Sequence, residues 1–127
     1  MLLVNAKAES SPIHRLGLVA QEFISKGSKI WRFQPGFDVK LSLEEFAAFP
    51  SPVQNQIRYY AYFCNATKSF LLSSDDDRFT NHSDTPNTGM EGCDDMLALR
   101  DIHPGEEITC DYRQVGMLDV PGGHPSA

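Results

Sequence analysis

The chain has 127 residues, a formal net charge of −6 and 41% hydrophobic residues. Its length fits one domain with one modest core, and its hydrophobic content lies above that of disordered chains. The acidic balance argues against direct nucleic-acid binding, which normally needs a basic face. It mildly favours a basic partner such as a lysine-containing peptide. No apolar run approaches the length of a membrane span, so we expect no membrane contact.

Three cysteines, Cys64, Cys93 and Cys110, are far apart and form no CxxC pair. An odd number of widely spaced cysteines favours reduced thiols over a disulfide framework. We therefore expect free thiols and a cytoplasmic protein. The acidic run at residues 75–77 lacks the alternating spacing of a calcium loop, so it predicts a solvated loop and no metal site.

The N-terminal third is typical of short strands and turns. Residues 2–7 predict a first strand, and a second apolar run at 13–20 is interrupted by Gly17. A glycine within a strand indicates a bulge or a group that approaches the backbone closely. The spacing I-x-x-G-x-x-I occurs around Gly27 and again around Gly105. Both copies predict a turn that enters a strand, with the glycine at positive φ.

Two short helices are expected in the middle of the chain. Ser42 and Glu45 have the spacing of a capping box, which predicts a helix start, and Pro50 ends this helix. A second helix is predicted over residues 53–60. The aromatic run at residues 59–63 then enters a strand, and we expect these rings in the core.

The remaining segments predict strands at residues 70–72 and 96–99 and a strand–turn–strand over 100–112. The whole chain is therefore expected to be mostly β with short helices, an α+β fold. We expect residues 1–115 to form the domain. The Pro- and Gly-containing residues 116–127 predict a flexible or loosely packed tail.

One stretch organises the rest. Residues 78–88 read RFTNHSDTPNT, and composition alone predicts a polar surface turn. Word for word, the stretch closely resembles the RFxNHSxxPNT signature of SET-domain methyltransferases. Two further blocks match that family in its own order. They are LGLVA with IxKGxxI from Leu16, and AxRDIxxGEEITxDY ending at Tyr112.

The resemblance covers about residues 13–112 and implies a SET-type fold of small antiparallel sheets. In that fold the NHS segment and the final GEE…DY segment thread into a C-terminal pseudoknot beside the active site. Asp84 stands where many relatives have a zinc-binding cysteine, which agrees with no metal. The chain resembles a minimal, stand-alone SET protein of the bacterial or viral type.

The resemblance also implies an activity. The family transfers a methyl group from S-adenosylmethionine to a lysine side chain of a protein, and the cofactor and the lysine enter from opposite faces. The tail, a partner in a homodimer or the substrate itself could close the substrate channel. The alternative is a SET-fold binding module with weak or lost catalysis.

Individual residues follow from the matched motifs. Tyr112 matches the family's catalytic tyrosine, whose hydroxyl lies at the point of methyl transfer. The substrate channel would contain Tyr62, Cys110 and Tyr112, and Cys110 stands where the family usually has Phe or Tyr. The cofactor-binding residues implied by the resemblance are Leu16, Gly17, Arg78, Phe79, Asn81 and His82.

Two departures and one supporting pair complete the assignment. Arg15 replaces the first glycine of the family's GxG, where its guanidinium would suit the cofactor carboxylate. The smaller Cys110 leaves the number of methyl groups open. Glu106 and Glu107 are expected to fix the pseudoknot by hydrogen bonds.

Overall fold

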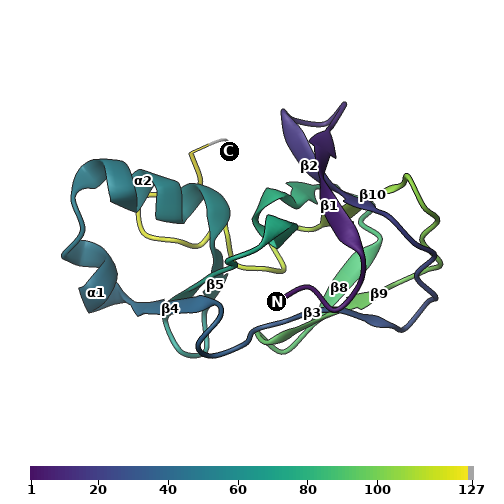
Figure 1. The fold of residues 1–127 in the computed structure, drawn as a ribbon. Coiled ribbons are helices and arrows are strands. Elements are labelled where there is room, and N and C mark those ends of the chain that lie inside the picture. The colour runs from purple at the N-terminus through teal and green to yellow at the C-terminus, as the bar shows by residue number, and fades with distance from the viewer. Residues whose placement is uncertain (126–127) are drawn as a thin grey trace.

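The computed structural model describes residues 1–125 of the chain. Figure 1 shows a group of helices and short strands on one side and strand-rich layers on the other. The elements in chain order are β1 (Ala6–Ser10), β2 (Leu16–Ala20), β3 (Lys29–Arg32), β4 (Val39–Ser42), α1 (Leu43–Ala47), α2 (Ser51–Tyr60), β5 (Tyr62–Cys64), β6 (Ser69–Leu72), the 3₁₀ helix η1 (Asp76–Phe79), β7 (Asn81–His82), β8 (Thr88–Glu91), β9 (Asp95–Ala98) and β10 (Glu107–Cys110).

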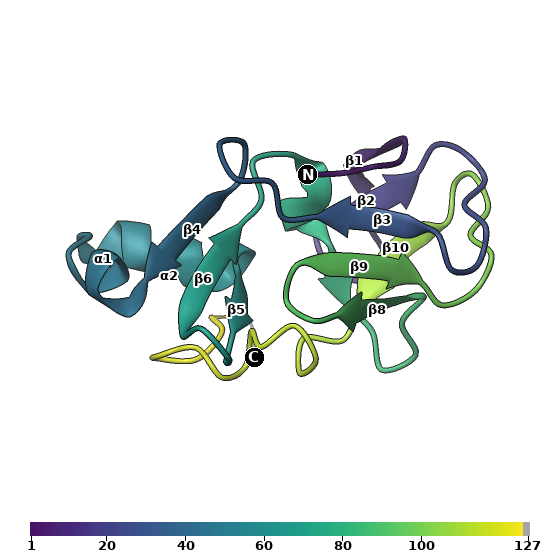
Figure 2. The ribbon, with the colours of Figure 1, turned by 90° about the horizontal axis from the view of Figure 1, so that it is seen from below.

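The strands form three small sheets, with orders β1-β2-β10-β7, β3-β9-β8 and β4-β6-β5. All neighbouring strands are antiparallel except β7 and β10. Figure 2 shows the β4-β6-β5 sheet beside α1 and α2, and the β3-β9-β8 sheet on the opposite side of the molecule. The predicted fold class, mostly β with short helices, is confirmed.

The local predictions hold with shifted boundaries. The Ser42 hydroxyl accepts from the Glu45 N–H and the Glu45 carboxylate accepts from the Ser42 N–H, which completes the predicted capping box. The second predicted helix is α2. The first strand begins later than predicted, at Ala6, while Leu2 makes only an isolated bridge to Trp31.

The two copies of the I-x-x-G-x-x-I spacing lie side by side. Gly27 and Gly105 both have positive φ, 88° and 89°, as predicted. Ile24 and Ile102 exchange both backbone N–H···O bonds at 2.8 Å. The repeated spacing therefore builds two turns that pair with each other in space.

Strand β10 brings the distant motifs together. It pairs antiparallel with β2, with Ile108 opposite Leu18, and parallel with β7, with Thr109 opposite Asn81. The C-terminal block therefore lies between the start of the domain and the NHS segment. This is the crossing expected for a SET-type fold.

The segment after β10 is packed against the domain, in contrast to the expectation of a loose tail. Met117 and Val120 of the predicted tail are buried. Val115, the last residue of the predicted domain, is buried as well, and its carbonyl accepts from the Phe63 N–H at 3.0 Å. These apolar side chains complete two core clusters, so burial outweighs the Gly and Pro content of the segment. Residues 126–127 of the predicted tail lie outside the described residues.

The expectation of three free thiols is wrong. Cys64 in β5 and Cys93 in the turn between β8 and β9 form a disulfide, with Cα atoms 5.7 Å apart, and Cys110 is the buried free cysteine. Sequence separation hid this pair, because the packing of two different sheets brings these residues, 29 positions apart, into contact. The disulfide also removes the argument from which a cytoplasmic location was expected.

Within residues 1–125, no helix is both long and apolar enough to cross a membrane. In the same part of the chain, no group of three or more His, Cys, Asp or Glu side chains is placed to hold a metal ion.

Candidate active site

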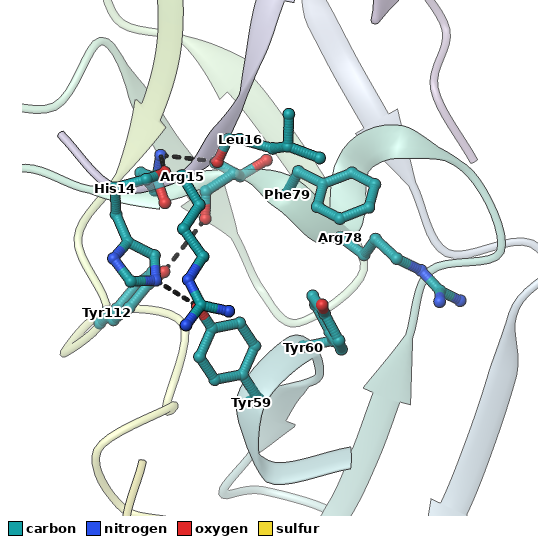
Figure 3. Close-up of a pocket in the computed structure, with 10 residues that line it drawn as sticks. His14, Arg15, Leu16, Tyr59, Tyr60, Arg78, Phe79 and Tyr112 are labelled. Carbon is teal, nitrogen blue, oxygen red and sulfur yellow. Dashed lines mark hydrogen bonds between the residues drawn. The ribbon is translucent and has the colours of Figure 1, made fainter. Parts of the chain in front are cut away.

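A pocket of about 200 Å³ lies where the end of α2 meets the start of β2 and the NHS segment (Figure 3). Its lining comes from four separate parts of the chain: His14, Arg15, Leu16, Tyr59, Tyr60, Arg78, Phe79, Thr80, Asn81 and Tyr112. An adjoining pocket of about 390 Å³ shares Arg15, Tyr59 and Tyr60 with it. The two together provide room on the scale of a small-molecule site.

Tyr112 lines this pocket with a fixed hydroxyl. The hydroxyl donates to the Thr80 carbonyl at 3.2 Å. Burial raises the pKa of Tyr112, and Cys110, Tyr59 and Glu107 add to the rise. The hydroxyl therefore stays neutral at physiological pH and can act as a hydrogen-bonding group.

Asn81 is buried and ties the pocket wall together. Its amide nitrogen lies 3.0 Å from the Leu16 carbonyl and 2.9 Å from the Glu107 carboxylate, with Ser11 and His14 acceptors at 3.2 Å. The Ser11 hydroxyl donates to the same carboxylate at 2.6 Å. Glu107 therefore holds the crossing by hydrogen bonds, as predicted. The Glu106 side chain accepts from the His103 N–H in the local turn, and its backbone carbonyl accepts from the Ala20 N–H of β2 at 2.9 Å.

His82 lies outside the pocket lining and orients Tyr112. Its Nδ1 accepts from the Tyr112 backbone N–H at 3.0 Å, which places the ring proton on Nε2. Nε2 then donates to Asp84 at 2.9 Å. His82, predicted to contact the cofactor, is thus not part of this pocket, and its side chain instead holds the backbone at Tyr112.

Gly17 is a close-approach glycine, but the approaching group is a side chain of the protein. A Cβ there would lie 2.4 Å from the Glu107 Oε2 atom. The absent side chain makes room for the carboxylate that binds Asn81. Leu16 lines the pocket and Gly17 does not.

The arginines and aromatic rings frame the opening. Arg15, at φ 39°, lines both pockets. Arg78 donates from Nε and Nη2 to the Ser73 carbonyl and lies 5.6 Å from the Tyr60 ring centroid. Phe79 meets Tyr60 edge to face, with centroids 5.8 Å apart. Arg78 therefore braces the wall, whereas Arg15 faces the opening.

The three residues predicted to line the substrate channel lie in two different places. Tyr112 lines the pocket, whereas Tyr62 and Cys110 are buried in the core cluster that contains Trp31 and Met96. Burial raises the pKa of the Cys110 thiol, which favours its neutral form. Tyr62 instead lines a second, much smaller cavity of about 20 Å³, next to the disulfide. As the side chains lie here, that cavity holds little more than one water molecule.

The sequence-based assignment missed four lining residues: His14, Tyr59, Tyr60 and Thr80. His14 Nε2 and the Tyr59 hydroxyl form a hydrogen bond that joins the start of β2 to the end of α2 (Figure 3). The aromatic run was expected in the core, and only its second part is there. One signal was available, because Tyr59 falls off the helical face formed by Val53 and Ile57.

The expected solvated loop at residues 75–77 is also wrong. Asp77 is fully buried, and Asp75 and Asp76 accept backbone N–H bonds from Leu2 and Ala8. The acids fix the N-terminal strand region to η1.

The family model of the SET domain matches residues 15–113. The chain therefore belongs to the SET-domain family, and the fold and the order of motifs described above agree with this.

Two solved structures have a similar fold. One is a candidate histone methyltransferase from Plasmodium falciparum, with a TM-score of 0.60 at 23% identity over 87% of this chain and 95% of that chain. The other is a humanised mutant of the Chaetomium thermophilum Polycomb Repressive Complex 2 bound to the inhibitor GSK126. Its TM-score is 0.62 at 19% identity, over 86% of this chain but only 15% of that chain. No curated protein matches the sequence.

Proposed function

We propose that the protein transfers a methyl group from S-adenosylmethionine to a lysine side chain of a protein substrate. The observation that carries the proposal is that three motif blocks, distant in the sequence, meet at one pocket. Leu16, Asn81 and Tyr112 come from three separate SET-family blocks, and all three line one pocket. Because a merely structural role would not require the blocks to share a pocket, this favours a common ligand.

The chemistry of the pocket lining fits this cofactor. The guanidinium of Arg15 suits a carboxylate, and the carbonyl of Leu16 can accept from an ammonium group. The rings of Tyr59, Tyr60 and Phe79 offer faces and edges for a purine. Arg15 stands at the position of the first glycine of the family's GxG, and its guanidinium would bind the cofactor carboxylate there.

When bound, the cofactor supplies a methyl group activated by a sulfonium. Tyr112 then acts by position. Because its only hydroxyl proton is donated to the Thr80 carbonyl, its oxygen presents lone pairs that can accept an N–H of the target amine. The amine must arrive neutral, and a desolvated channel lowers a lysine pKa from its free value of about 10.4.

A lysine-bearing protein segment is the proposed substrate, and the chain's charge of −6 favours such a basic partner. The test is transfer of label from labelled S-adenosylmethionine to whole-cell lysate protein. We expect Tyr112→Phe to lower the initial rate at least about tenfold, because an acceptor at the reacting nitrogen is lost. Tyr60→Phe is the matched control, since it removes from the same pocket a hydroxyl that makes no hydrogen bond within residues 1–125.

Thermal unfolding with and without S-adenosylmethionine accompanies the assay, since a ligand of the folded state raises the melting temperature. Cofactor stabilisation without labelled protein would favour the alternative, a SET-fold binding module. Neither stabilisation nor label would overturn the cofactor assignment, and equal rates for native and Tyr112→Phe chains would overturn the role of Tyr112.

A further inference from the structure

A chain of hydrogen bonds joins the two tyrosines that the family resemblance assigns to the substrate channel. The Tyr112 hydroxyl donates to the Thr80 carbonyl at 3.2 Å. The Thr80 hydroxyl donates to the Asp77 carbonyl at 2.7 Å and lies 3.4 Å from its Oδ1. The Tyr62 hydroxyl donates to Asp77 Oδ2 at 2.9 Å. Two neighbouring turns of the η1–β7 segment therefore connect Tyr112 to Tyr62.

Asp77 is an unusual residue for a core. It is 0% exposed, and within residues 1–125 no side-chain cation forms an ion pair with it. Hydroxyl groups donate hydrogen bonds to its carboxylate, including that of Ser73 at 2.7 Å, and the charge of the N-terminal ammonium adds a smaller stabilisation of the ionised form. Burial raises the pKa of Asp77 to about 6, while the Ser73 and Tyr62 hydrogen bonds oppose the rise. A buried carboxylate without a cation destabilises a fold, so its presence beside a candidate site favours a functional role.

The network lies between the two cavities. Tyr112 lines the large pocket and Tyr62 lines the small cavity near the disulfide. Cys110 shares a core cluster with Tyr62, and Tyr112 packs against the same cluster. The family resemblance implies that the cofactor and the lysine enter from opposite faces. With the cofactor in the large pocket, this would bring the target amine between the two tyrosines.

We propose that Asp77 is a positioning residue for methyl transfer, holding the Tyr62 hydroxyl so that its oxygen accepts a hydrogen bond from the target amine. This inference rests on the proposed function. A tyrosine hydroxyl can donate one hydrogen bond. The Tyr62 hydroxyl donates to the Asp77 carboxylate, and the Tyr112 hydroxyl donates to the Thr80 carbonyl. Both oxygens then face the amine as acceptors. Two N–H bonds held in this way direct the nitrogen lone pair toward the methyl group.

The test measures the initial rate of methyl transfer at saturating S-adenosylmethionine. The acceptor is the lysate protein that the native chain labels in the assay above. We expect Asp77→Leu to lower the initial rate about tenfold, because Tyr62 loses its acceptor. Cofactor affinity should stay unchanged, since Asp77 does not line the large pocket. Asp77→Asn should retain most of the rate, because an amide oxygen still accepts from Tyr62. Asp101→Asn removes the same charge from an exposed position and is the control.

A pH profile separates positioning from simple structural support. The charged or titratable groups that face Asp77 are Asp75, the N-terminal ammonium, Tyr62 and Cys110. Below about pH 6 Asp77 gains a proton and can donate to Tyr62, so the native rate should fall. Protonation of the substrate amine also lowers the rate as pH falls, but it acts on both chains alike. The ratio of the native rate to the Asp77→Asn rate should therefore fall below about pH 6.

The Tyr62→Phe background provides the second readout. If Asp77 acts through the Tyr62 hydroxyl, adding Asp77→Leu to the Tyr62→Phe chain should not lower the rate further. A further tenfold loss there, or a ratio of native to Asp77→Asn rates that does not change with pH, would overturn the inference while native label transfer keeps the proposed function standing. If Asp77→Leu does not fold, Asp77→Asn and Tyr62→Phe still decide. A native chain that transfers no label would overturn the proposed function, and this inference with it.

Discussion

At the scale of single residues, the Glu107 carboxylate fixes the positions of several side chains around the pocket. Glu107 accepts from Ser11 and Asn81, and it occupies the space that a side chain at position 17 would need. Because these contacts join the start of β2, the NHS segment and β10, a change of one methyl group at Gly17 acts on three strands.

We expect Gly17→Ala to lower the free energy of unfolding by about 1–3 kcal/mol, because Glu107 must leave its hydrogen bonds or the strands must separate. Urea denaturation measures this. Gly89→Ala is the matched control, since its new Cβ would meet only the end of the half-exposed Leu99 side chain, at 3.0 Å. An equal loss in both variants would contradict the role given to Glu107.

The buried carboxylate of Asp77 makes a separate prediction about stability and pH. Its pKa is raised from 3.8 to about 6, so between these values the folded chain keeps a proton that the unfolded chain releases. The contribution of Asp77 to the free energy of unfolding therefore falls as pH rises through this window. The size is on the order of 3 kcal/mol.

Asp77→Asn removes this titration. We expect the unfolding free energy of the variant minus that of the native chain to increase between pH 4 and pH 7, as followed by urea denaturation at each pH. Asp95 and Asp111 have lowered pKa values, from bonds to Arg32 and Arg113. They act below pH 4 and in both chains alike, so they cancel. A difference that does not change with pH would show that Asp77 is not perturbed.

At the scale of elements, the Cys64–Cys93 disulfide ties β5 to the turn between β8 and β9. These elements belong to different sheets. The bond lies at the small cavity that Tyr62 lines, so it also limits how far that cavity can widen.

For protein purified without reductant and then denatured, we predict one reactive thiol per chain, that of Cys110. Three thiols would contradict the disulfide. We further expect the double variant Cys64→Ser/Cys93→Ser to lose about 3 kcal/mol of unfolding free energy, from the freed loop in the unfolded chain. A reductant should destabilise the native chain and leave the double variant unchanged.

For the whole molecule, local chemistry predicted the elements and motif resemblance predicted the topology. The capping box at Ser42 and the positive φ of Gly27 and Gly105 follow from rules that act over a few residues. The placement of β10 between β2 and β7 could come only from the family resemblance, because no local pattern encodes a crossing between distant strands.

The errors share one physical cause, which is that burial depends on neighbours distant in the sequence. Asp77 and Val120 have polar or flexible surroundings in the sequence, yet both are in the interior. Cys64 and Cys93 meet only once the sheets are assembled. Within the site, the three family blocks identified Leu16, Asn81 and Tyr112, whereas Tyr59 and Tyr60 required the docking of α2 to be known.

The position of β10 also has a consequence for synthesis on the ribosome. Until residues 107–110 emerge, β2 and β7 each present an unpaired edge, and Asn81 lacks the Glu107 carboxylate. Exposed edges invite pairing with other chains, and contacts between distant segments form late. The nascent chain therefore lacks the Asn81–Glu107 contact in the pocket wall until β10 emerges, so one strand both pairs with the open edges of β2 and β7 and completes the wall of the pocket.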